Sequence, residues 1–227
     1  MLENRVNKEI LRKRLMQEPF TRKTISFYRY INIENPKEFR DKLYAEWSAL
    51  ACFGRIYVAR EGINAQMSVP EHHLERFLQQ LNSITELAGI PIKYAIVDDG
   101  KSFYKLTIKV RPKIVADGLD HGTYDLSKVG NHLSAIESHE LAGNPETLVI
   151  DMRNHYESEI GRFENAVCPD ADTFKDAIRM VVGEFNNQKD RKILLYCTGG
   201  IRCEKASAYL LHHGFKDVSQ LYGGIIE

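Results

Sequence analysis

The sequence predicts two domains of different fold class, with residues 1–19 forming a helix before them. Residues 20–113 show strand and helix patterns in the order βαββαβ, which is the split-βαβ arrangement of an α+β domain. Residues 114–227 alternate short apolar runs with helical segments, which is typical of a doubly wound parallel α/β domain. A chain of 227 residues is long enough for both.

The strands and helices of the first domain are predicted from the alternation of apolar and polar residues and from helix start signals. Asn35 and Pro36 stop a strand and begin a helix, because proline suits the first helical turn. Pro70 starts a second helix after a strand, and a charged helix is expected at 3–17. Strands are expected at 24–33, 54–60, 63–69, 91–97 and 104–110. This order is that of ferredoxin-like domains.

The second domain follows a stretch with two glycines, residues 112–124, which is expected to be a linker. Ser134 with Glu137 forms a capping-box signal for a helix start. Further helices are expected at 173–185 and 202–213, and strands at 148–152, 192–197 and 218–222. The apolar runs at 148–152 and 192–197 are of the kind buried inside a parallel sheet.

Composition excludes several classes of protein. Hydrophobic residues make up 43% and charged residues 27%, so the chain is not disordered throughout. The 31 basic and 31 acidic residues exclude a uniformly basic nucleic-acid binder but not a local basic patch. No apolar run could span a bilayer and the N-terminus lacks a signal-peptide pattern, so a cytoplasmic protein without membrane contact is expected. The four cysteines and eight histidines show no ligand spacing, so no metal or cofactor is predicted.

The decisive segment is K-I-L-L-Y-C-T-G-G-I-R-C, where a buried strand delivers Cys197 at its carboxyl end just before a helix. Gly199 and Gly200 permit a tight turn whose amides point inward around the sulfur. Such a cradle at a helix N-terminus lowers a thiol pKa and favours the nucleophilic thiolate. We therefore predict Cys197 as the catalytic residue. The expected anion- or substrate-binding loop consists of Thr198, Gly199, Gly200, Ile201, Arg202 and Cys203.

Alternatives remain for several of these residues. Cys197 taken alone could be a small buried core residue. Arg202 could contact an anionic substrate or close the loop. Cys203 could resolve a persulfide, form a disulfide with Cys197, or have no catalytic part. Arg153 could belong to a charged rim, although an ion pair with Asp151 or Glu157 that fixes the loop is favoured.

The segment C-T-G-G-I-R resembles the active-site loop of rhodanese domains, in which the first cysteine carries a persulfide. The segments D-M-R-N-H-Y-E at 151–157 and G-F at 214–215 agree with that resemblance. Rhodanese-like phosphatases have five residues between cysteine and arginine, whereas four separate Cys197 from Arg202. The smaller loop favours sulfur or oxygen chemistry over phosphate-ester hydrolysis. Thr198 stands where many thiosulfate sulfurtransferases have arginine, which argues against thiosulfate as the donor.

Together with G-R-I-Y-V-A-R-E-G-I-N-A-Q at 54–66 and K-V-R-P-K-I-V-A-D-G-L at 109–119, these motifs resemble the bacterial tRNA uridine hydroxylase family. The resemblance implies an acylphosphatase-like first domain and a rhodanese-like second domain. It also implies oxygen-dependent formation of 5-hydroxyuridine at the wobble position of tRNA, with Cys197 essential and molecular oxygen as co-substrate. Members of that family usually continue into a cysteine-rich tail, so a tail is expected beyond Glu227.

Two other functions remain as alternatives to tRNA uridine hydroxylation. A persulfide sulfurtransferase would use the same loop without needing an RNA-binding half. A non-enzymatic adaptor is least favoured because the cysteine loop is intact. If tRNA is the partner, its phosphates are expected to meet Arg22, Lys23, Arg29, Lys105, Lys109 and Arg111. Tyr28, Tyr30, Phe103 and Tyr104 are candidates for stacking on anticodon-loop bases, and no protein partner is evident.

Overall fold

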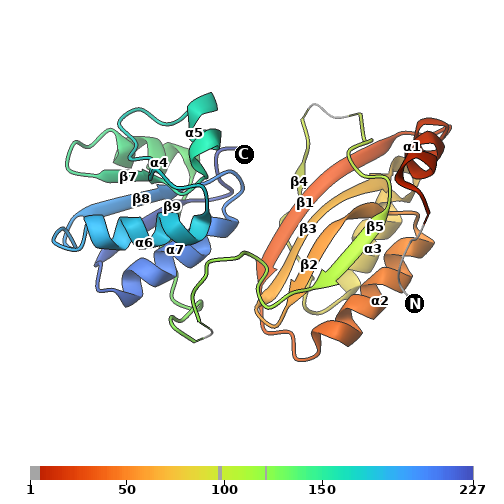
Figure 1. Cartoon of the computed structure of the whole chain (residues 1–227), viewed down its shortest axis with the longest axis horizontal. Coiled ribbons are helices and arrows are strands. Elements are labelled where there is room, and N and C mark those ends of the chain that lie inside the picture. The colour runs from red at the N-terminus through yellow and green to blue at the C-terminus, as the bar shows by residue number, and fades with distance from the viewer. Residues whose placement is uncertain (1–5, 97–98, 121, 227) are drawn as a thin grey trace. The chain divides into compact units, whose positions relative to one another are not determined.

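The computed structural model describes residues 6–96, 99–120 and 122–226, which divide into two compact units, residues 1–114 and 115–227 (Figure 1). Each unit has its own sheet and its own hydrophobic core. Among the described residues, none of the helices combines the length and apolar character that crossing a membrane requires.

Within its described residues, the first unit has a five-stranded mixed sheet, three α-helices and one 3-10 turn. Its elements are α1 (Lys8–Met16), β1 (Arg22–Tyr30), α2 (Pro36–Ala49), β2 (Phe53–Ala59), β3 (Gly62–Pro70), a 3-10 turn (Glu71–His73), α3 (Leu74–Ser83), β4 (Lys93–Tyr94) and β5 (Leu106–Val110). The strand order is β4-β1-β3-β2-β5, in which only the β2–β5 pair is parallel. The predicted split-βαβ arrangement is confirmed, with β5 as an added edge strand.

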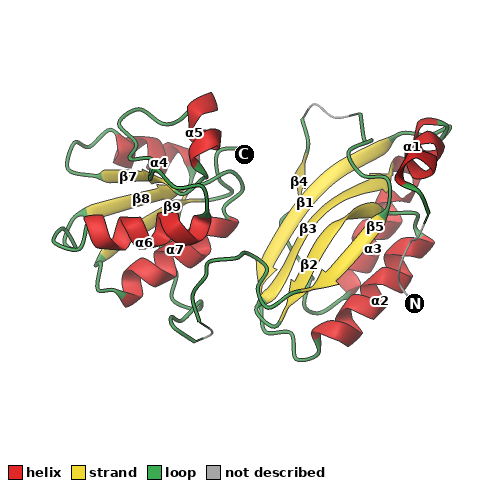
Figure 2. Cartoon of the chain, in the orientation of Figure 1, coloured by secondary structure: helices red, strands yellow, loops and turns green. Residues whose placement is uncertain are grey.

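The core of this unit lies on one side of its sheet. Figure 2 shows α2 and α3 on that face. The rings of Trp47 from α2 and Phe77 from α3 lie 5.7 Å apart, and Phe27 from β1 packs against both. Helix α2 begins where predicted, because the Asn35 side chain accepts a hydrogen bond from the Glu38 amide. The strand side chains that point away from the helices form a second face, described below.

The second unit is a parallel sheet with helices on both faces. Its elements are β6 (Asn131–Leu133), α4 (Ala135–Ala142), β7 (Leu148–Asp151), α5 (His155–Ile160), α6 (Phe174–Glu184), β8 (Lys192–Tyr196), α7 (Ile201–His212) and β9 (Asp217–Leu221). The strand order is β6-β9-β8-β7 and every pair is parallel. Helices α6 and α7 pack on one face and α4 on the other, which confirms the doubly wound prediction.

Several elements differ from their predicted bounds. The strand expected at 91–97 is reduced to β4, because only residues 93 and 94 pair with β1; residue 97 lies outside the described part. The helix expected at 3–17 begins at Lys8 within the described residues. The expected linker at 112–124 is packed at Ile114 and Asp117, which are 3% and 0% exposed. Strand β6 and helix α5 were not predicted, being three and six residues long with polar ends.

Candidate functional site

Cys197 lies at the carboxyl end of β8, between the central strand of the sheet and the first turn of α7. Gly200 turns the chain with φ of +92°, a conformation that side chains disfavour, and its amide lies 3.2 Å from the Cys197 sulfur. Helix α7 begins at the next residue, so its N-terminal amides face the same sulfur. The thiol is 1% exposed, which places it in the core between the sheet and the helix.

The pKa values of the two thiols of the loop, Cys197 and Cys203, shift in opposite directions. Burial raises the pKa of Cys197, but a hydrogen bond from the Cys203 thiol, the charge of Arg202 and the amides of residues 202 and 203 outweigh burial. They lower the pKa of Cys197 from 9.0 to about 6. Burial and the neighbouring sulfur raise the pKa of Cys203 well above its ordinary value. Of the two thiols, Cys197 is therefore the more readily ionised, and Cys203 keeps its proton as a donor.

Arg202 is held by Glu157, which comes from the first turn of α5. Its guanidinium donates hydrogen bonds of 2.8 and 3.2 Å to the two carboxylate oxygens of Glu157. The Thr198 hydroxyl donates to the same carboxylate at 2.7 Å, so one side chain joins both ends of the loop. Burial raises the pKa of Glu157, but these hydrogen bonds and that from the Asn154 amide outweigh it and lower the pKa. Of the two predicted roles for Arg202, the structure shows loop closure.

Arg153 pairs with Asp151 and not with Glu157. Its guanidinium lies 2.6 Å from the Asp151 carboxylate, and both residues are buried. The favoured interpretation of a structural ion pair is thus the one observed, with Asp151 as the partner. The role of Glu157 as the anchor of the loop was missed. The signal for it was the spacing from Asn154, since these two residues form a capping box that starts α5.

The carbonyl side of the loop is occupied by the segment after β9. The amides of Ile225 and Ile226 donate to the carbonyl oxygens of Cys197 and Thr198 at 3.0 and 3.3 Å. Gly224, with φ of +77°, approaches so closely that a Cβ atom there would lie 2.5 Å from the Thr198 oxygen. The loop therefore presents its amides to the sulfur while its carbonyl groups bind residues 225 and 226.

Three of the six predicted phosphate-binding residues are engaged within the protein. The Arg22 guanidinium is buried and binds the Glu18 carboxylate at 2.6 and 2.8 Å. Lys23 lies 3.4 Å from the Glu71 carboxylate, and Arg29 donates to two carbonyl oxygens. Lys105 and Lys109 instead line a hollow on the sheet, and the Arg111 guanidinium lies over the Tyr57 ring at 5.8 Å.

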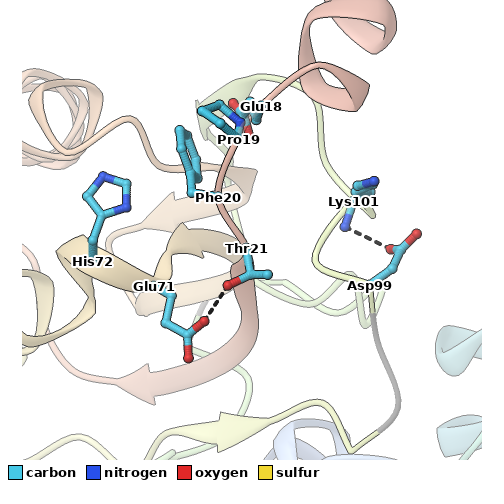
Figure 3. A pocket seen from close by; sticks show the side chains of 8 residues that line it. All are labelled: Glu18, Pro19, Phe20, Thr21, Glu71, His72, Asp99 and Lys101. Carbon is cyan, nitrogen blue, oxygen red and sulfur yellow. Dashed lines mark hydrogen bonds between the residues drawn. The ribbon is translucent and has the colours of Figure 1, made fainter.

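A larger hollow of about 850 Å³ lies beside the N-terminal end of β1 (Figure 3). The residues that line it are Glu18, Pro19, Phe20, Thr21, Glu71, His72, Asp99 and Lys101. The Thr21 hydroxyl donates to Glu71, and the rings of Phe20 and His72 meet edge to face at 4.8 Å. Its three carboxylates make it unsuited to phosphate. In the described part of the chain, no group of three or more His, Cys, Asp or Glu could hold a metal ion.

Comparisons with known proteins agree with this two-unit architecture. Residues 22–114 match the family described as the UPF0176 acylphosphatase-like domain, and residues 134–227 match the rhodanese-like domain. The chain is 55% identical over 225 residues to a protein of Leptospira interrogans and 50% identical over 228 residues to one of Photorhabdus laumondii. Both relatives are named tRNA uridine(34) hydroxylase, and the matches cover 99% and 100% of this chain.

The chain spans 61% and 65% of the lengths of these two relatives. A solved rhodanese-like domain from Anabaena is 24% identical, with a TM-score of 0.30, over 35% of this chain and 86% of that one.

Proposed function

Since the chain belongs to the family that joins a UPF0176 acylphosphatase-like domain to a rhodanese-like domain, with curated members named tRNA uridine(34) hydroxylase, we propose that it hydroxylates uridine 34 of tRNA. The product is 5-hydroxyuridine at the wobble position. The observation that carries the proposal is the loop of Cys197, where a thiol of lowered pKa is surrounded by hydrogen-bond donors.

Cys197 is the catalytic residue of this proposal, and the residues from Thr198 to Cys203 form its anion-binding loop. The sulfur is 1% exposed, which leaves little room for a uracil ring to reach it directly. A persulfide places its outer sulfur about 2 Å farther from the backbone, at the mouth of the loop. Burial of the thiol thus supports the persulfide as the reacting form. The loop amides then stabilise negative charge on sulfur during the reaction.

The sulfur nucleophile adds to C6 of the uracil ring, and the electron pair moves toward C5. The electron-rich C5 attacks an oxygen atom of molecular oxygen, and loss of the C5 proton with departure of the sulfur restores the ring. One oxygen atom stays on C5 and the other leaves as water, so two electrons and two protons must be supplied, here by two molecules of an external thiol that become a disulfide. A uridine in an anticodon loop reaches such a site because it is unpaired and easily unstacked.

The proposal is tested by nucleoside mass spectrometry of tRNA from cells that lack this protein. Complementation with the wild-type chain should restore 5-hydroxyuridine, and Cys197→Ser should not. Cys168→Ser is the matched control, because Cys168 lies outside the loop and its thiol donates to the Ala166 carbonyl at 3.7 Å. Equal modification with Cys197→Ser and wild type would show that this thiol is not catalytic.

A second candidate is persulfide sulfur transfer to a small acceptor, since the same buried thiol and donor-lined loop suit a stable persulfide. It is distinguished by following sulfane sulfur. If the persulfide of Cys197 passes to cyanide or a small thiol at a useful rate while the nucleosides of tRNA stay unchanged, sulfur transfer is the function. If tRNA is modified, the hydroxylase proposal stands.

A further inference from the structure

The sheet of the first unit has a face that α2 and α3 do not cover, and this face carries no acidic residue at its strand positions. The residues that alternate with the core positions point to this face. They are Thr24, Ser26, Tyr28 and Tyr30 on β1, Asn64 and Gln66 on β3, Arg55 and Tyr57 on β2, and Thr107 and Lys109 on β5. We call this set the open face.

The open face is hollowed where β2 and β5 run side by side. The hollow measures about 290 Å³, and its lining consists of Gly54, Arg55, Tyr57, Ser102, Phe103, Tyr104, Lys105, Thr107 and Lys109. The register places Tyr57 opposite Lys109 and Arg55 opposite Thr107. Aromatic rings and cationic side chains therefore alternate within one small concavity, and none of its lining residues is acidic.

The cations of the hollow differ from Arg22 and Lys23 in their partners. Among the described residues, no ion pair involves Arg55, Lys105 or Lys109, whereas Arg22 and Lys23 each bind a carboxylate. Arg55 and Lys109 are exposed, and the rings beside them are half-buried. The Arg12 and Arg111 guanidinium groups lie over the Tyr104 and Tyr57 rings at 5.7 and 5.8 Å, so a stacking base would take their place on these rings. Cations without acidic partners next to aromatic rings are the features that bind phosphates and stack unpaired bases.

We propose that the open face binds an unpaired RNA loop, with Arg55, Lys105 and Lys109 on the phosphates and Tyr57, Phe103 and Tyr104 as stacking surfaces. This inference rests on the proposed function for the identity of the RNA, which is the loop that carries uridine 34. Gln66, which is exposed and pairs with Arg55, lies next to the hollow and supplies an amide donor and acceptor for base edges. The neighbouring Asn64 amide donates to the Ile114 carbonyl at 3.4 Å.

The chemistry of the hollow favours single-stranded RNA over other polyanions. An acidic peptide would use the cations but leave three aromatic rings unpaired, and a duplex would hide its base faces from them. The larger hollow near Thr21 gives an internal contrast, because Glu18, Glu71 and Asp99 would repel phosphate there. These two concavities thus have opposite preferences for an RNA backbone.

Binding of the full chain to a stem–loop RNA with an unpaired uridine tests the cationic part. Arg55→Ala with Lys109→Ala should weaken the Kd by at least about tenfold and reduce its dependence on salt. Lys42→Ala with Arg76→Ala is the control, since this pair also removes one Lys and one Arg, both exposed, from α2 and α3. Equal weakening by both double variants would overturn the assignment of the open face.

A fully paired RNA of the same length tests the aromatic part. It should bind more weakly than the stem–loop, and Tyr57→Leu should weaken stem–loop binding by about fivefold or more, while Tyr57→Phe keeps the ring and the affinity. Equal affinity for both RNAs, or a neutral Tyr57→Leu, would overturn the single-strand assignment.

RNA binding can be measured without the reaction, so binding by the open face and hydroxylation of uridine 34 can each be disproved without the other. A chain that binds through this face but leaves uridine unmodified removes the hydroxylase proposal alone. Modification that continues with normal binding by the Arg55 and Lys109 variants removes the interface alone.

Discussion

Cys203 supports the reactive thiol without being reactive itself. Its sulfur is fully buried and protonated at neutral pH, and it donates a hydrogen bond to the Cys197 sulfur. A donor of this kind stabilises the thiolate more than the thiol, which is why the pKa of Cys197 falls although burial opposes ionisation. The sequence left open persulfide resolution, a disulfide with Cys197 or no catalytic part for Cys203. The hydrogen bond to the Cys197 sulfur supports a donor role that was not among these alternatives.

Removing that donor should change the pH at which Cys197 reacts. The thiolate fraction of Cys197 rises as pH rises through its pKa, so alkylation of the wild-type thiol should be half-maximal near pH 6. Cys203→Ala should move this midpoint to higher pH, and Cys203→Ser, which keeps a donor, should move it less. Mass spectrometry of the peptide containing Cys197 measures the alkylation rate. An unchanged midpoint in Cys203→Ala would mean that the hydrogen bond does not control acidity.

The segment that follows β9 fixes the loop through Gly224. Its φ of +77° is unfavourable for other residues, and a Cβ atom would meet the carbonyl oxygens of Thr198 and Cys197 at 2.5 and 2.6 Å. Gly224→Ala should therefore displace the loop, lowering the unfolding free energy by about 1–3 kcal/mol and slowing alkylation of Cys197. Gly183→Ala in α6 is the control, because nothing lies within 4 Å of its added carbon. Denaturant unfolding and alkylation rates measure the two effects, and equal behaviour of both variants would contradict this role.

The elements that the sequence predicts well are those with strong local signals. Helix α2 has a capping asparagine and a first-turn proline, and β7 and β8 are continuous apolar runs, so each begins within about two residues of its predicted start. Strand β6 has the burial pattern of a half-exposed segment and exists only through pairing with β9. Its formation depends on a residue pair separated by almost ninety positions, which no local pattern reveals.

The prediction of the site has the same limit, because side-chain contacts between distant segments cannot be read from a local pattern. The cysteine loop follows from contiguous residues, whereas the anchoring of Arg202 by Glu157 needs α5 to lie beside α7. Likewise, six cations of the first unit are predicted from the sequence as phosphate contacts. The sequence does not reveal that Glu18 neutralises Arg22 or that Arg29 binds carbonyl groups. Whether a charged residue is free to bind a ligand can be judged only once its contacts in the folded protein are known.

Within the second unit, a buried ion pair joins the segment at residues 115–119 to α7. The Lys205 ammonium lies 2.8 Å from the Asp117 carboxylate, and both side chains are fully buried. Lys205 also donates to the Val115 carbonyl, and Asp117 accepts from the Tyr124 hydroxyl at 2.8 Å. Because α7 carries the cysteine loop at its N-terminus, this pair ties the start of the unit to the helix that positions the site.

Breaking one member of this pair should cost more than replacing both. Asp117→Ala leaves an uncompensated buried ammonium and should lower the unfolding free energy by about 3–5 kcal/mol. Asp117→Leu with Lys205→Met removes both charges and should recover part of that loss. Asp190→Asn is the control, because its pair with Lys216 is exposed and should have little effect. Thermal or denaturant unfolding measures all three, and a double variant no more stable than Asp117→Ala would argue against this account.

The absence of acids from the strand positions of the open face has a consequence for encounters in solution. The chain carries equal numbers of acidic and basic residues, so a face with only cations leaves an excess of acids on the remaining surface. A polyanion approaching the cationic strands meets an attracting field, whereas the three carboxylates of the hollow near Thr21 repel one that approaches there. This asymmetry extends about 8 Å into physiological salt. Orientation is thus selected before contact, and dilute salt should both accelerate association and strengthen the final complex.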